Sequence, residues 1–323
     1  MRLEVSATPA SVTVAGSVRA MARAVVIADV PLELEVADGP MPSGIAQLLA
    51  HLPPAESPAD VCISHGLVGP LVPDRPADLE LGRLAVWVDE PDVHVRDVSG
   101  ATAHLGDGRA LVGGGDERAA NGFHTLFLFA LTHLLAQRDR FVLHGAGVAR
   151  RGTAFVALGG SGAGKSTLAV AAAETGWSVL SDDMVVVRSE AGRLDVAGVP
   201  RAVLVPSGLG WTVPTRLNEE DPRGRLTAET DLHPGWFPVA GTIAVGHSTS
   251  PEGQLRRADG QQAFAQVMGS FVSTLNPPLL RRFLPTAAAL SRLPGWALDH
   301  GADPATRRVV AAHLLTTAAM AAP

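Results

Sequence analysis

Apolar and polar positions alternate in short runs through the first third of the chain. Such runs occupy residues 32–36, 84–88 and 93–98, and a shorter one lies at residues 12–14. Because successive side chains of a strand point to opposite faces, this alternation predicts β-strands with one buried face. Proline and glycine residues that favour turns separate the runs, and a glycine run at residues 113–115 follows them. We therefore expect a β-rich N-terminal domain over residues 1–112.

The rest of the chain, residues 113–323, mixes helical and strand patterns. Apolar residues recur every three or four positions over 117–138, which predicts a buried helix. A hairpin signature follows, with strands at 141–148 and 153–158 on either side of a turn at Arg151 and Gly152. Beyond it we expect a helix ending near residue 174, strands at 178–187, 194–197 and 237–245, a long polar loop at 216–235, and a mostly helical tail from residue 263. The pattern predicts a second, α/β domain.

Composition narrows the class of protein. The chain is 46% hydrophobic and 18% charged, which is typical of a folded core and excludes a largely disordered protein. No apolar run is long enough to span a membrane, and Glu4 lies where a signal peptide would be apolar. The single cysteine, Cys62, makes no internal disulfide, and no Cys/His spacing of a zinc site is present. We expect a cytoplasmic protein without a membrane partner.

Charge is unevenly distributed along the chain. Residues 1–112 hold 7 arginines and 15 acidic residues, a net charge of −8, within a total of −6. No basic stripe is present, so a nucleic-acid partner is not expected. Every cation except Lys165 is an arginine. Lys165 therefore marks a position where a compact ammonium is needed in place of a planar guanidinium.

Lys165 belongs to a phosphate-binding motif, G-x-x-x-x-G-K-[ST], between a predicted strand and a predicted helix. The glycines let backbone N–H groups point at phosphate oxygens, and the helix N-terminus adds a favourable dipole. In such loops the lysine contacts the β- and γ-phosphates, and the following serine, here Ser166, binds Mg²⁺. We expect ATP and Mg²⁺ to bind at Gly159, Gly160, Ser161, Gly162, Ala163, Gly164, Lys165, Ser166 and Thr167.

Two adjacent carboxylates, Asp182 and Asp183, follow 17 and 18 residues after Lys165, at the end of an apolar run. A β-α-β unit returns the chain to the same edge of the sheet, so this strand should end beside the loop. One of these carboxylates could bind Mg²⁺, directly or through water, while the other accepts the proton of an acceptor hydroxyl. Both side chains reach the site only if regular pairing ends by Ser181. The alternative is one metal ligand with a neighbour that only solvates or caps the strand.

Two further residues are candidates for the same site. If Arg151 and Gly152 form a two-residue turn, His144 lies opposite Gly159, beside the phosphates. His144 could then contact the γ-phosphate or hold a catalytic carboxylate, although a structural histidine is the alternative. Arg201 could neutralise charge on the transferred phosphoryl group, and an ordinary surface arginine is the alternative.

Taken together, these residues resemble the kinase domain of the HPr serine kinase/phosphorylase family. The resemblance covers roughly residues 140–250 and is carried by residues 143–145, the loop 159–166 and the aspartate pair, with His144 placed 21 residues before Lys165. It implies the fold shared with ATP-type phosphoenolpyruvate carboxykinase. It also implies Asp183 as the base toward a serine hydroxyl, His144 in the active site and Ser166 as a Mg²⁺ ligand. The family forms oligomers, so a homo-oligomer is implied as well.

The chain departs from the bifunctional members of that family. They carry an acidic residue followed by Arg-Gly-Leu-Gly, where residues 199–204 here read Val-Pro-Arg-Ala-Val-Leu. They also have glutamate after the loop serine, where this chain has Thr167. Phosphorylase activity is therefore not expected. The chain is more similar to stand-alone relatives associated with peptide modification.

The resulting prediction is an ATP-dependent kinase domain of the HPr kinase type over residues 113–323, preceded by the smaller β-rich domain. We expect it to phosphorylate a serine of a peptide or protein, which the first domain would help to recognise. Two alternatives stay open. One is a kinase of a small hydroxylated metabolite such as free serine. The other is a nucleotide-dependent regulatory binding module.

Overall fold

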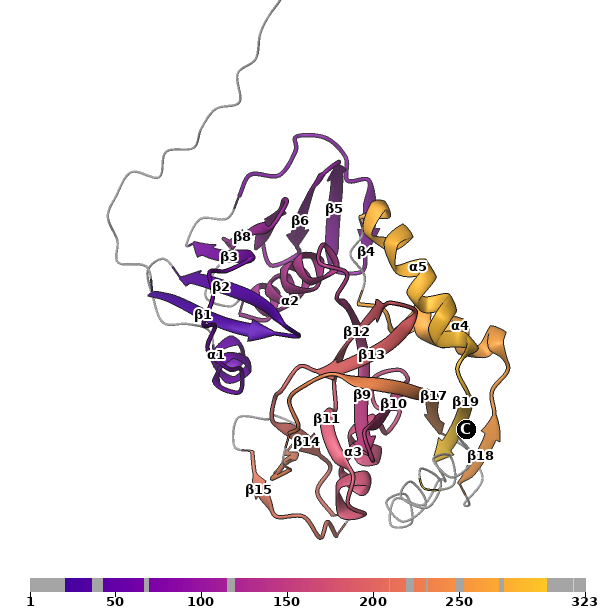
Figure 1. Cartoon of the computed structure of the whole chain (residues 1–323). Helices are drawn as coiled ribbons and strands as arrows, with labels where there is room; N and C mark the ends of the chain where they lie inside the picture. The colour runs from indigo at the N-terminus through magenta and orange to yellow at the C-terminus, as the bar shows by residue number, and fades with distance from the viewer. Residues whose placement is uncertain are drawn as a thin grey trace, which may run out of the picture.

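The computed structural model describes residues 21–36, 43–66, 70–114, 120–208, 210–218, 224–230, 232–247, 253–272, 276–300 and 316. Over these residues the chain is a mixed α/β protein with several sheets (Figure 1). The strand predicted at residues 12–14 lies outside the described residues. None of the described helices has the length and hydropathy that crossing a membrane needs.

The first sheet contains the N-terminal strands in the order β1-β2-β3-β8-β7-β6-β5-β4, and confirms the predicted strands at 32–36, 84–88 and 93–98. β3 pairs in parallel with β2 and β8, whereas the other pairs are antiparallel. In β2, Leu32 and Leu34 are buried while Glu33 and Glu35 point to the opposite face, as the alternation requires. The elements are β1 (Met21–Ile27), β2 (Val30–Val36), α1 (Ser43–Ala50), β3 (Val61–Gly66), β4 (Leu79–Leu81), β5 (Leu84–Asp89), β6 (Asp92–Asp97), β7 (Thr102–Leu105) and β8 (Arg109–Gly113).

Helix α2 (Ala120–Ala136) lies between the first sheet and the rest of the molecule (Figure 1). Its Phe127 and Leu131 are fully buried in a core that also contains Ile63 of the first sheet and Val142 and Met184 of the second. The predicted helix is therefore present. The boundary predicted at residue 113 places α2 in the second domain, whereas its packing also joins it to the first sheet.

The second sheet follows the order β10-β9-β12-β13-β17-β19-β18, with β11 paired to β9. Because β10 also pairs with β17, the five strands β9, β10, β12, β13 and β17 close into a circuit. The predicted hairpin is confirmed: Arg151 and Gly152 have φ of 53° and 81°, as a type I′ turn requires. The strands are β9 (Phe141–Arg150), β10 (Thr153–Leu158), β11 (Ser178–Ser181), β12 (Met184–Glu190), β13 (Arg193–Gly198), β17 (Phe237–His247), β18 (Gln254–Arg257) and β19 (Gly295–His300).

Helices cover the two faces of this sheet. Alternate residues of β10 point to opposite sides, so Phe155 packs with α3 (Lys165–Glu174), and Val156 packs with α4 (Gly260–Ser270) and α5 (Pro277–Arg292). A small antiparallel sheet, β14-β16-β15, covers α3 through Val203, Val205 and Ala228. Its strands are β14 (Val203–Val205), β15 (Thr215–Leu217) and β16 (Leu226–Ala228).

Three predictions about secondary structure were wrong in part. The strand predicted at 178–187 is two strands, β11 and β12, separated by Asp182 and Asp183. The segment 216–235 is not entirely loop, since it contains most of β15 and all of β16. The tail from residue 263 contains the expected helices but also β19, which pairs with β17 on one side and β18 on the other. Strand pairing across the sequence overrides the local helical pattern there.

Candidate active site

The loop between β10 and α3 has a backbone that suits glycine alone. Gly162 and Gly164 have φ of 79° and 103°, in the region that L side chains rarely adopt. A Cβ on Gly159 would lie 2.5 Å from the carbonyl oxygen of Val245, and one on Gly164 would lie 2.5 Å from the ring of His300. The loop therefore runs close against the ends of β17 and β19.

The other loop residues differ in exposure. Gly160 and Ser161 are exposed, Ser166 is half-buried, and Ala163 and Thr167 are buried. The N-cap of α3 is a glycine and offers no side-chain oxygen to the first backbone N–H groups of the helix. An anion such as phosphate could take the place of that capping oxygen.

The side chain of Lys165 lies inside the loop and is only 6% exposed. Its Nζ donates to the carbonyl oxygens of Gly159 at 2.8 Å and Gly160 at 2.9 Å, and lies 3.0 Å from Nε2 of His144. Burial lowers the pKa of Lys165 below its ordinary value, and the nearby aspartates oppose this shift without cancelling it. The two loop carbonyl oxygens thus hold the Lys165 ammonium in place, and the oxygens of a bound phosphate could accept its hydrogen bonds instead.

Regular strand pairing ends at Ser181 and resumes at Met184. The hydroxyl of Ser181 accepts from the backbone N–H groups of Asp183 and Met184, at 3.4 and 3.3 Å, and so caps the break. The predicted condition for bringing two adjacent carboxylates to one site is therefore met. Asp182 contacts Ser166 at the start of α3, whereas Asp183 contacts His144 and Arg201.

The carboxylate of Asp182 is buried, with 6% of the residue exposed. Ser166 and the backbone N–H of Leu204 donate to it, but its buried Oδ1 has no hydrogen-bond donor among the described residues. Burial raises the pKa of Asp182 to about 6, and these hydrogen bonds offset only part of the shift. A serine hydroxyl beside an unsatisfied carboxylate oxygen is a set of hard oxygen ligands that suits Mg²⁺.

Asp183 bridges two cationic or proton-donating side chains. Its Oδ1 lies 3.2 Å from Nδ1 of His144, and its Oδ2 accepts from Nη1 of Arg201. Burial raises the pKa of Asp183, but the hydrogen bond from His144 and the positive charge of Arg201 outweigh it. The resulting pKa is below the ordinary value. Asp183 is therefore ionised at neutral pH, and its pKa is shifted in the opposite direction from that of its neighbour Asp182.

His144 connects the loop lysine to the second aspartate. It lies on β9, one residue before Gly145, which pairs with Leu158, the last residue of β10, as the two-residue turn predicts. An ammonium only donates, so Nε2 of His144 accepts from Lys165 and Nδ1 carries the proton. Nδ1 then donates toward Asp183, where both the backbone and the carboxylate oxygens are within 3.2 Å. Lys165, His144, Asp183 and Arg201 form one polar chain.

Two histidines of this region were not singled out from the sequence. His247 and His300 end the parallel strands β17 and β19; β17 pairs with β10, and β19 pairs with the other side of β17. Nε2 of His247 donates to the carbonyl oxygen of Gly162 at 2.7 Å, and the buried His300 packs against Gly164. His247 follows the strand predicted at 237–245, whereas no strand was predicted before His300. Residues at the carboxyl ends of neighbouring parallel strands meet at one edge.

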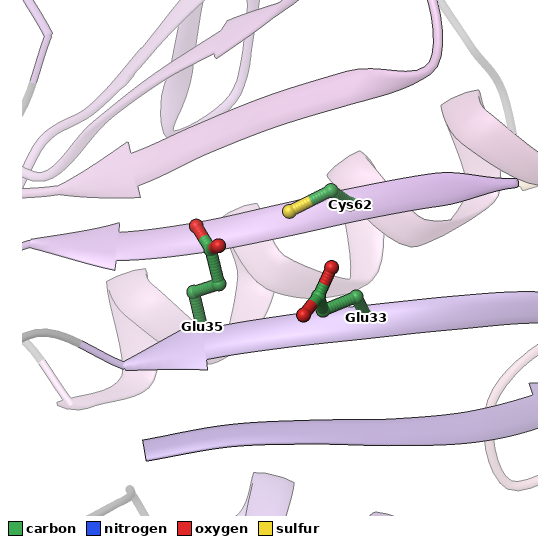
Figure 2. A group of neighbouring side chains, drawn as sticks. All are labelled: Glu33, Glu35 and Cys62. Carbon is green, nitrogen blue, oxygen red and sulfur yellow. The ribbon is translucent and has the colours of Figure 1, made fainter. Parts of the chain in front are cut away.

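A second group of side chains that could bind a metal lies on the first sheet, far in sequence from the phosphate-binding loop. Figure 2 shows Glu33, Glu35 and Cys62 on neighbouring strands, with potential ligand atoms within 4.8 Å of one another. All three residues are half-buried, and Ser64 already donates to Glu35 at 2.7 Å. The proximity of the two carboxylates raises the pKa of the Cys62 thiol, after the larger effect of burial. These observations alone do not define a metal site.

Comparisons with known proteins show a distant similarity among solved structures. No protein-family model matches the chain, and no curated protein matches it. Among solved structures, the chain is similar to the HPr(Ser) kinase/phosphatase from Coxiella burnetii. The identity is 12% and the TM-score 0.30, over 55% of this chain and 90% of the other. A similarity this distant assigns no role to any residue of the site.

Proposed function

We propose that the protein is an ATP-dependent kinase that transfers the γ-phosphate to a hydroxyl, that of a serine in a peptide or protein. The polar chain from Lys165 through His144 to Asp183 and Arg201 supports this proposal most directly. A loop that only binds nucleotide needs the lysine and a metal ligand. A second, ionised carboxylate held between a histidine and an arginine is an additional element that suits transfer to a hydroxyl.

In this proposal, the acceptor hydroxyl gives its proton to Asp183 as its oxygen forms a bond to the γ-phosphorus. The bond from that phosphorus to the β–γ bridging oxygen breaks, and ADP leaves. Asp183 is a weak base because its pKa is low, but phosphoryl transfer has a loose transition state in which orientation of the nucleophile matters most. Arg201 and Lys165 would balance the negative charge of the transferred group.

Mg²⁺ would be held by Ser166 and Asp182. The donorless Oδ1 of Asp182 supports this assignment, because a bound cation would satisfy that buried oxygen. When bound, the ion would neutralise charge on the β- and γ-phosphates.

The test is a transfer assay with purified protein, Mg²⁺ and γ-labelled ATP. Serine-containing peptides, free serine and other small hydroxy compounds would be incubated separately and examined by mass spectrometry for one added phosphate. We expect labelled acceptor with the native protein. Asp183→Asn should bind ATP with an unchanged Kd but transfer at least about 1000-fold more slowly, since the group that orients the hydroxyl is lost.

Asp139→Asn is the matched control. Asp139 is exposed on a different surface, where it pairs with Arg282, and its φ of 55° is one that asparagine tolerates. This variant should transfer phosphate at the native rate. Unchanged transfer by Asp183→Asn would refute the role of Asp183 as the base. ATP binding by the native protein without any phosphorylated acceptor would instead favour a regulatory module.

A further inference from the structure

A cavity of about 340 Å³ opens next to Arg201, between the end of α1 and the small sheet. Its size is at the lower end of the range for small-ligand sites, so it would hold a group about as large as an amino acid. The first domain contributes one lining residue, His51, and the others come from the segment that follows β13. The polar residues that line it are His51, Arg201, Arg216, Thr227, Glu229 and Thr230.

The cavity is connected to the proposed base through one side chain. Arg201 lines the cavity, and its guanidinium also donates to the carboxylate of Asp183. A ligand in the cavity would therefore lie within one arginine side chain of Asp183. For Asp183 to take its proton, an acceptor bound there has to extend its hydroxyl past Arg201 to within hydrogen-bond distance of the Asp183 carboxylate.

The lining of the cavity favours an anion. Arg216 pairs with Thr227 across β15 and β16, so the two side chains share one face of the small sheet. Arg201 is engaged by Asp183, but Arg216 makes no hydrogen bond or ion pair with any residue that the structure describes. Glu229 is the one carboxylate among the lining residues, against two arginines and a histidine. An arginine with its fork of N–H donors unused suits a carboxylate, which it can bind through two parallel hydrogen bonds.

We propose that this cavity is the acceptor site and that it selects acceptors carrying a carboxylate close to the hydroxyl. This inference rests on the proposed kinase function. Arg216 binds the carboxylate, and Glu229 and Thr230 provide acceptors for an amino or amide N–H of the same ligand. The shared chemistry, a hydroxyl with a neighbouring carboxylate, occurs in free serine and in a serine next to an acidic residue of a peptide. The contribution of His51 gives the first domain a direct place in acceptor recognition.

The first part of the test compares acceptors that differ in the carboxylate. Free L-serine is compared with serinol, which has the amine and hydroxyl but no carboxylate, and a serine peptide flanked by aspartate is compared with the same peptide flanked by alanine. KM and kcat are measured for each. We expect the KM of the better carboxylate-bearing acceptor to be roughly 10- to 100-fold lower than that of its neutral partner, as for a charged hydrogen-bond pair. The preferred acceptor, free serine or the acidic peptide, shows whether the carboxylate belongs to the serine itself or to a neighbouring acidic residue.

The second part removes the arginine. Arg216→Gln should abolish the preference by raising KM for the carboxylate-bearing acceptor, and Arg216→Lys should restore part of it. Arg96→Gln is the matched control, because Arg96 is exposed on β6 and does not line the cavity. It should keep the native preference. Transfer without any preference for a carboxylate, or a preference that Arg216→Gln leaves intact, would overturn the inference while the kinase proposal stands.

Calorimetry of L-serine and serinol with the unreacted protein separates the two proposals. Binding of L-serine but not serinol, lost in Arg216→Gln, would support the carboxylate site even if no acceptor were phosphorylated, and the kinase proposal alone would then fail. If no carboxylate-dependent binding and no phosphorylated acceptor were found, both proposals would be overturned.

Discussion

Replacing Asp182 with asparagine should stabilise the metal-free protein at neutral and alkaline pH. The carboxylate is buried, its Oδ1 has no donor among the described residues, and burial raises its pKa to about 6. Asparagine has nearly the same shape and keeps an oxygen that can accept from Ser166, but it carries no charge. The substitution therefore removes the cost of burying an ionised group without opening a cavity.

The sign and size of the effect follow from proton linkage. In the unfolded chain the pKa is the ordinary 3.8, so the folded state binds the proton more tightly, and the wild type loses stability as pH rises from about 4 through 6. Each pKa unit corresponds to about 1.4 kcal/mol, so the full cost above pH 7 is about 3 kcal/mol. At pH 5 the carboxylate is only partly ionised in the folded protein, and the cost is about half of its full value. The Asp182→Asn variant would avoid this cost at every pH.

Urea denaturation in EDTA at pH 5, 6, 7 and 8 measures the effect. The stability advantage of Asp182→Asn over the wild type should roughly double across this series, to about 3 kcal/mol. Asp183→Asn is the matched comparison with the opposite sign. The pKa of Asp183 is lowered, so its carboxylate stabilises the fold above its ordinary pKa, and this variant should be less stable than the wild type at pH 7. If the stability difference between Asp182→Asn and the wild type did not change with pH, or if the variant were less stable than the wild type at pH 8, ionised Asp182 would not destabilise the fold and the reasoning would be refuted.

Two further substitutions test the packing around the site. A Cβ on Gly198 would lie 1.8 Å from the carbonyl oxygen of Leu180, so Gly198→Ala should lower the unfolding free energy measured in urea by about 3 kcal/mol and should reduce phosphate transfer. Gly269→Ala is the control, because Gly269 lies on α4 with open space around it, and this variant should not be destabilised. Equal stability of the two variants would contradict the close approach of Gly198 to Leu180. His247→Ala removes the hydrogen bond to Gly162 and should weaken ATP binding about fivefold by calorimetry with little change in unfolding free energy, whereas an unchanged Kd would show that this bond does not position the loop.

Local sequence was sufficient where the chain makes its contacts with near neighbours. The two-residue turn at Arg151 and Gly152 sets the β9–β10 register, and that register alone placed His144 close to the loop. The motif itself specified a strand, a glycine loop and a helix, and all three are present. Lys165, the single lysine of an arginine-rich chain, was expected at a position that needs a compact ammonium, and its side chain lies inside the loop.

Elements that depend on distant partners could not be predicted from their own residues. β19 follows a helical segment and becomes a strand because β17 and β18 flank it. β15 and β16 are three-residue strands whose polar sequence resembles loop, and they are specified by pairing with each other and with β14. His247 and His300 reach the loop only through the parallel pairing of β17 with β10 and β19, which no local pattern encodes.

The aspartate pair shows why residue types alone leave chemistry undecided. In sequence, Asp182 and Asp183 are equivalent, and either could be a ligand or a base. The break after Ser181 directs one carboxylate to the buried start of α3 and the other toward His144 and Arg201, so burial raises one pKa while these partners hold the other below its ordinary value. A carboxylate that is unsatisfied until a cation arrives suits a metal ligand, and one that is already ionised and oriented suits a proton acceptor. The division of roles between neighbours thus follows from their surroundings, which a single turn of backbone makes different.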